Sequence, residues 1–164
     1  MRVRLAAIPA FAVLALSACE RRETATPAPE VATFSHRLSG DISGEYRPID
    51  DDVGQPVTSL FIGQDEAFAA WEAGRRGPPP LILSLSGPQG EVRVTPETYV
   101  VTDGAVQMRG LAPDGGIVQL QGRIDQGALA TARRNLGDQT PVIVGALEKD
   151  GRRTAFTLGW WGGD

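Results

Sequence analysis

The sequence is poor in residues that carry out covalent chemistry, with one cysteine, Cys19, and one histidine, His36, among 164 residues. A single cysteine excludes an intramolecular disulfide. Any imidazole base would have to be His36, and the Gly-x-Ser-x-Gly turn that presents a serine nucleophile in many hydrolases does not occur. No spacing of histidine, cysteine and acidic residues suggests a metal site. We therefore expect a protein that is not an enzyme, with no catalytic residue, metal or cofactor.

The sequence also has no apolar run long enough to cross a membrane. The apolar stretch 5–16 is far shorter than the roughly 20 residues that a membrane-spanning helix needs. Arg2 and Arg4 precede this stretch, and the small residues Ser17 and Ala18 follow it. This order of charged, apolar and small residues is typical of a signal peptide. We expect residues 1–18 to be removed on export.

The segment Leu16-Ser17-Ala18-Cys19 resembles the lipobox of bacterial lipoproteins, which has a branched apolar residue, two small residues and a cysteine. The resemblance implies that the Cys19 thiol receives a diacylglycerol and that cleavage precedes Cys19. It also implies that the new amine receives a fatty acid such as palmitate. Two or three acyl chains hold a protein stably, at about 0.8 kcal/mol per buried methylene. The alternative is an incidental cysteine after an ordinary cleavage site at Ala18.

The residue after the cysteine bears on the membrane. In enteric bacteria an aspartate there tends to retain a lipoprotein in the inner membrane, and this chain has Glu20. The resemblance therefore implies the outer membrane, with the domain facing the periplasm.

Positive charge is scarce once the signal peptide is removed. Loss of Arg2 and Arg4 lowers the basic total from 16 to 14 against 20 acidic residues, so the net charge becomes −6 in place of −4. This balance argues against nucleic acid or an anionic lipid surface as a partner, because clustered cations bind both. Residues 20–32 are charged, small and proline-bearing, which is typical of a flexible linker behind the lipidated N-terminus at Cys19. Residues 33–164 have the length of a single domain.

Short segments of alternating polarity indicate that this domain is rich in β structure. Asp103-Gly104 and Asp150-Gly151 are hairpin-turn dipeptides between such segments. The segments lie at 33–47 (one or two strands), 57–62, 81–86, 91–95, 98–102, 106–109, 118–124, 141–147 and 154–161. They predict a mainly β chain with two short helices, an α+β fold built on a small antiparallel β barrel or sandwich of about eight strands. In the last hairpin we expect Val142, Val144 and Ala146 on one face, matched by Phe156, Leu158 and Trp160.

Two segments predict helices. Residues 65–73 are good helix formers with acids early, Arg75-Arg76 late and a stop at Gly74 or Gly77. Asp125 is placed to cap a helix over 126–136, with Leu129, Ala132 and Leu136 on its apolar side and Arg133-Arg134 near its end. Helix-end electrostatics account for these charged residues.

Three features are candidates for binding. Asp50-Asp51-Asp52 concentrates carboxylates as a calcium loop does, but the alternating pattern of such loops is missing, so a solvated loop is the simpler interpretation. Trp160 and Trp161 are adjacent in a strand and face opposite ways, so one indole belongs to the core. The other either packs under a helix or anchors a sugar or protein partner. His36 is a third, weaker candidate.

These observations favour a membrane-tethered envelope lipoprotein without catalytic activity, attached through lipid on Cys19, that binds an envelope protein or glycan. One alternative is a β barrel that holds an apolar ligand in its interior. A more remote one is an uncharacterised enzyme that uses His36.

Overall fold

A computed structural model describes residues 34–49, 55–75 and 77–163, which belong to one compact unit. Ten strands and two helices make up this part of the chain. The strands are β1 (Phe34–Arg37), β2 (Gly44–Pro48), β3 (Val57–Ile62), β4 (Leu81–Gly87), β5 (Gly90–Val94), β6 (Pro96–Thr102), β7 (Ala105–Leu111), β8 (Ile117–Ile124), β9 (Ile143–Lys149) and β10 (Arg152–Trp161). The helices are α1 (Asp65–Glu72) and α2 (Gln126–Arg134). None of the helices in this part is long and apolar enough to cross a bilayer.

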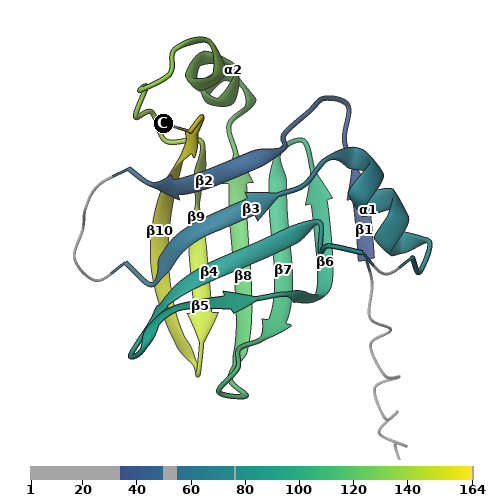
Figure 1. The fold of residues 1–164 in the computed structure, drawn as a ribbon. Helices are drawn as coiled ribbons and strands as arrows, with labels where there is room; N and C mark the ends of the chain where they lie inside the picture. Colours follow the sequence, from purple (N-terminus) through teal and green to yellow (C-terminus); the bar gives the residue numbers. More distant parts are fainter. Residues whose placement is uncertain (1–33, 50–54, 76, 164) are drawn as a thin grey trace, which may run out of the picture. The chain divides into compact units, whose positions relative to one another are not determined.

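All ten strands belong to one sheet with the order β1-β6-β7-β8-β9-β10-β2-β3-β4-β5. The sheet curls into a half-barrel in which β2 to β5 pass across β6 to β10 (Figure 1). Neighbours are antiparallel except β1 and β6, which are parallel with Phe34 opposite Tyr99. The prediction of a mainly β chain with two helices is confirmed. The prediction of about eight antiparallel strands is wrong in two respects. The sheet has ten strands among the described residues, and it is mixed because β1 pairs in parallel with β6 and not with its sequence neighbour β2.

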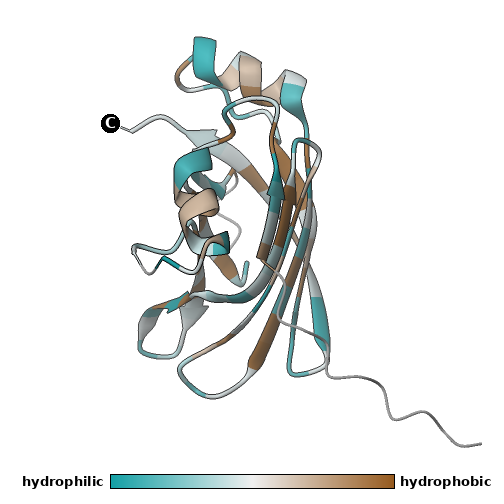
Figure 2. Ribbon diagram, turned by 90° about the vertical axis from the view of Figure 1, so that its right-hand side faces the viewer, coloured by the Kyte–Doolittle hydropathy of each residue, from teal (hydrophilic) through white to brown (hydrophobic). Residues whose placement is uncertain are grey.

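The burial of every second residue along a strand explains how the curled sheet forms a core. Along β8, every second residue from Val118 to Ile124 is buried and the residues between them are exposed, as the sequence predicts. Hydrophobic and hydrophilic residues alternate along the strands in the same way (Figure 2). Fully buried side chains of the sheet and of α1 form the core, the largest being Tyr46, Phe68, Tyr99 and Phe156.

The last hairpin differs from the prediction in the face that β9 buries. Val144 is 51% exposed, whereas Ile143 and Leu147 are buried. The reason is the register, which places Phe156 opposite Gly145. A Cβ atom on Gly145 would lie 2.0 Å from the carbonyl oxygen of Gln121, so glycine alone fits where the strands approach so closely. The predicted face of Phe156 and Leu158 is confirmed, and both are buried.

The helices begin where the sequence predicts and end earlier. The Asp125 carboxylate accepts a hydrogen bond of 2.9 Å from the Ala128 amide, which confirms the predicted cap of α2. Leu136 lies beyond the end of α2 and is 70% exposed, so its assignment to the apolar side of the helix is wrong. Arg75 likewise lies beyond α1, whose last turn has no basic residue.

Candidate functional site

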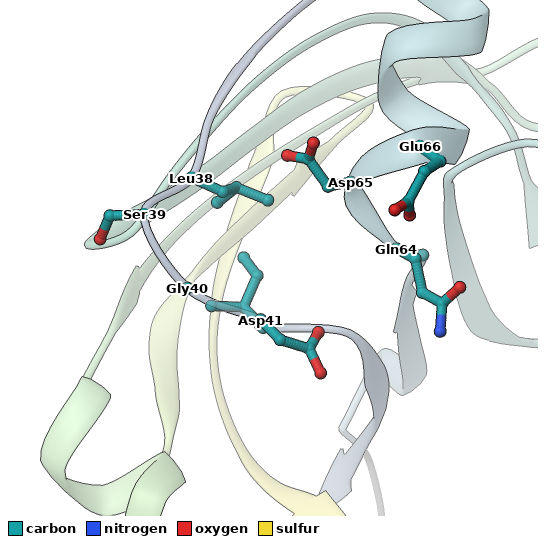
Figure 3. A pocket seen from close by; sticks show the side chains of 9 residues that line it. Leu38, Ser39, Gly40, Asp41, Gln64, Asp65 and Glu66 are labelled. Atoms are coloured by element: carbon teal, nitrogen blue, oxygen red, sulfur yellow. The ribbon is translucent and has the colours of Figure 1, made fainter.

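Among the hollows on the surface of the described residues, two differ in their chemistry. The first, which we call the acidic hollow, has a volume of about 410 Å³ and lies between the β1–β2 connection and the start of α1 (Figure 3). Asp41 lines it from the connection, and Asp65 and Glu66 line it from the helix. The remaining lining residues are Leu38, Ser39, Gly40, Ile42, Gly63 and Gln64.

His36 is held beside this hollow by two carboxylates of α1. Its Nδ1 atom lies 2.7 Å from Glu72 Oε1, and its Nε2 atom lies 3.0 Å from Asp65 Oδ1. A carboxylate accepts hydrogen bonds, so the protonated imidazolium is the form that donates to both at once. The ring also stacks on buried Phe68 at 5.4 Å between centroids, and the His36 side chain is 13% exposed. This arrangement fastens α1 to β1.

Asp41, on the other side of the acidic hollow, is fastened as well. The guanidinium of Arg133 donates to the carbonyl oxygens of Asp41 and Ser43, each at 2.6 Å. Hydrogen bonds from the Ser43 side chain and amide are the main reason that the pKa of Asp41 lies below its usual 3.8, and Arg133 adds to the effect. In the described ranges, no group of three or more acidic, histidine or cysteine side chains is arranged to hold a metal ion.

The second hollow, which we call the aromatic cleft, has a volume of about 220 Å³ and contains both tryptophans of β10. It lies where the end of β10 and strand β2 meet the connection that follows α2. Its lining residues are Arg47, Pro48, Ile49, Leu136, Gly137, Asp138, Gln139, Gly159, Trp160, Trp161, Gly162 and Gly163.

Trp161 forms a cation–π pair in this cleft. The Arg47 Cζ atom lies 3.4 Å from the centroid of the Trp161 ring. Strand pairing explains the contact, because Gly159 lies opposite Arg47 and Trp161 opposite Glu45, which places Arg47 and Trp161 on a diagonal of one face. Glu45 accepts a hydrogen bond of 3.0 Å from Arg47 Nε and thereby holds the guanidinium over the indole. The Arg47 guanidinium therefore contacts both the Glu45 carboxylate and the Trp161 indole.

Trp160 points to the other face and packs partly against the core, opposite Tyr46 of β2. A Cβ atom on Gly44 would lie 2.5 Å from Trp160 Nε1, so the indole fits only because residue 44 is glycine. This nitrogen is buried and has no hydrogen-bond partner among the described residues. The opposite edge of the ring lies close to Gly162 in the cleft. Trp160 is therefore a structural wall of the cleft.

The connection after α2 supplies the remaining wall. Asp138 accepts a hydrogen bond of 2.7 Å from the Thr140 amide. Hydrogen bonds from Thr140 are the main reason that the pKa of Asp138 lies below its usual value. Leu136, at 70% exposure, adds an unshielded apolar side chain beside this ionised carboxylate. The cleft thus combines indole, aliphatic, cationic and anionic groups within a small volume.

The structure brings together two of the candidates that the sequence offers. Trp160 and Trp161 share the aromatic cleft, whereas His36 lies apart from it, on β1 beside α1. Cys19 and Asp50-Asp51-Asp52 lie outside the described residues.

Sequence reasoning missed Arg47 and Asp138 as cleft residues and Asp65 and Glu72 as partners of His36. Helix-end electrostatics alone also proved an incomplete interpretation of Arg133, which binds the β1–β2 connection. Each of these contacts joins segments far apart in the chain, and no local pattern signals them.

Comparison of the chain with models of protein families, with curated proteins and with solved structures gave no match.

Proposed function

We propose that this chain is a lipid-anchored protein of the cell envelope, facing the periplasm from the outer membrane, that binds an envelope component through the aromatic cleft. The lipobox resemblance at Cys19 supports the anchor. The observation that carries the binding role is the meeting of Trp160, Trp161 and Arg47 in one small cleft. Tryptophan and arginine are the residue types most enriched among those that dominate binding energy.

The arrangement of His36 supports a role without catalysis. A general base needs a ring nitrogen within reach of the proton that it removes. Both ring nitrogens of His36 already face carboxylate oxygens at hydrogen-bonding distance. The carboxylates of Asp65 and Glu72 have a structural role here, since their contacts with His36 join β1 to α1. The histidine is therefore a fastening of the fold in this proposal.

The anchor is tested on the full-length exported protein, wild type beside Cys19→Ser. We expect the intact mass of the membrane-extracted wild type to match residues 19–164 plus a diacylglycerol and an acyl group. The Cys19→Ser variant should lose both the added mass and the membrane association. An unmodified mature protein in the soluble fraction would refute the anchor.

The binding role is tested in the same cells by a photo-crosslinking amino acid at position 139, an exposed residue in the lining of the cleft that leaves both tryptophans in place. Position 117 is the matched control, because Ile117 is an exposed apolar residue on β8 outside the cleft. We expect a specific adduct at 139, whether protein or glycan, that is missing at 117. Identical patterns at the two positions would refute the cleft as the binding site.

A further inference from the structure

We infer that the aromatic cleft receives a single ring of an uncharged saccharide, as part of an envelope glycan. This inference rests on the binding role proposed above and names its ligand class. The cleft holds about 220 Å³, which is below the roughly 300 to 1,000 Å³ of sites that enclose drug-sized ligands. A volume of this size suits one ring with its substituents, with the rest of a chain extending into solvent.

The balance of charge in the cleft disfavours an anionic ligand. Arg47 and Asp138 are the charged residues among those described in its lining, and they carry opposite signs. Arg47 is also paired with Glu45 at 3.0 Å. With Glu45 counted, carboxylates outnumber cations there, so a phosphate or carboxylate ligand would be repelled and a neutral ligand would not.

The lining also matches both sides of a sugar ring. A pyranose has an apolar face of C–H groups, which stacks on an indole, and a rim of hydroxyl groups that both donate and accept hydrogen bonds. Trp161, with Arg47 over one face of its ring, and Leu136 supply apolar surface. Gln139 and Asp138, on the same connection as Leu136, supply acceptors. Arg47 has five N–H donors, of which Nε and Nη2 are directed to Glu45. The cleft therefore offers the combination of apolar platform and polar rim that a neutral sugar needs.

The geometry is already set in the absence of ligand, which lowers the entropic cost of binding. Arg47 and Glu45 hold one another in position beside Trp161, and Thr140 holds the Asp138 carboxylate. Trp160 is packed between Gly44 and Gly162 and cannot rotate freely. Many tethered protein molecules would each bind one ring of the same glycan. Their combined affinity for the glycan would then be high although each single site binds weakly.

The inference is tested by isothermal titration of the full-length protein in detergent with chitohexaose and maltohexaose, two neutral oligosaccharides. Hexagalacturonate is the anionic comparison. We expect binding of at least one neutral oligosaccharide, with tenfold or weaker affinity for the anionic one. Trp161→Ala should weaken binding at least tenfold. Trp71→Phe is the matched control, because Trp71 lies on α1 outside the cleft, and it should bind as the wild type does.

A second variant separates loss of binding from loss of folding. Leu136→Glu changes an exposed side chain at the rim of the cleft, so the fold should be retained while binding weakens at least fivefold. Failure of the wild type to bind either neutral oligosaccharide would overturn the inference, as would wild-type affinity in both Leu136→Glu and Trp161→Ala. If those titrations fail while crosslinking at position 139 still captures a protein, the binding role survives and the saccharide does not.

Discussion

The acidic hollow and the aromatic cleft use polar side chains in different ways. Around the acidic hollow, His36, Asp65 and Glu72 bind one another, and Arg133 binds the backbone beside Asp41. The larger hollow is therefore a place where distant segments are fastened together. In the aromatic cleft, Trp161 remains partly exposed in a smaller space. Under the binding role that we propose, the difference teaches that the volume and acidity of a hollow are weaker guides to a binding site than large aromatic side chains left partly exposed.

The largest effect should come from removing the buried aromatic side chain on which His36 stacks. Phe68 is fully buried and contacts the rings of His36 and Tyr99 at 5.4 and 5.3 Å between centroids. We expect Phe68→Ala to lower the free energy of unfolding by about 3 to 5 kcal/mol, because it removes buried apolar area and leaves a cavity. Urea denaturation monitored by circular dichroism measures this change. A loss below about 1 kcal/mol would contradict a structural role for this region.

The next effect should follow from removing the histidine that joins β1 to α1. We expect His36→Ala to lower the free energy of unfolding by about 2 kcal/mol, since it removes two hydrogen bonds to charged groups. His36→Gln is the matched control, because an amide can still donate to one carboxylate and should restore part of the loss. Stability equal to the wild type in both variants would show that the pairing with Asp65 and Glu72 adds nothing.

A smaller effect is expected at Arg133, which lies between the two regions. Its guanidinium binds two backbone carbonyls near the acidic hollow and lies 5.6 Å from the ring centroid of Trp160. Arg133→Met should cost about 1 to 2 kcal/mol and shift the tryptophan fluorescence maximum. Arg134→Met is the control, because Arg134 contacts Thr131 of its own helix. If the two variants behave alike, the regions are not linked through Arg133.

Truncation of the cleft tryptophan should have little effect on stability. Trp161 is half-buried at the end of β10, so we expect Trp161→Ala to lower the free energy of unfolding by less than about 1 kcal/mol. The same urea titration used for Phe68→Ala makes the comparison direct. A loss as large as that of Phe68→Ala would mean that Trp161 serves the fold, and the contrast between the two regions would fail.

Lowering the pH below 4 should reduce stability slightly through both regions. Asp41 and Asp138 have folded pKa values below their usual 3.8, chiefly through hydrogen bonds from Ser43 and from Thr140. Their stabilisation is therefore fully present above pH 3.8 and disappears as the pH falls through the lower folded values, because the unfolded chain takes up protons first. Asp41→Asn and Asp138→Asn should each flatten the fall in melting temperature below pH 4. An unchanged acid profile in either variant would contradict the lowered pKa at that residue.

Local features of the fold could be predicted from the sequence because their causes are local. Asp125 caps α2 through a bond to a residue three positions away, and Asp150-Gly151 turns the last hairpin with positive φ angles at both residues. The buried face of β8 follows from strict alternation. In each case the residues that determine the structure lie within a few positions of one another.

Long-range features could not be predicted in the same way. The parallel pairing of β1 with β6 joins residues more than 60 positions apart, and nothing in either segment encodes its partner. In β9, alternating apolar residues on both faces made the buried face ambiguous until pairing placed Phe156 over Gly145. The candidate site has the same origin. Two tryptophans were visible in the sequence, but the cleft required Arg47 and Asp138 from other elements.

The pairing of His36 with α1 has a mechanical consequence. The described domain begins at β1, a strand of four residues at one end of the sheet. A pull applied through the preceding residues would act first on this short strand. The contacts of His36 with Asp65 and Glu72 pass that load to α1, which Phe68 anchors in the core. Under the lipid anchor that we propose, tension on the N-terminal end would therefore act on β1 and α1 together through this one side chain.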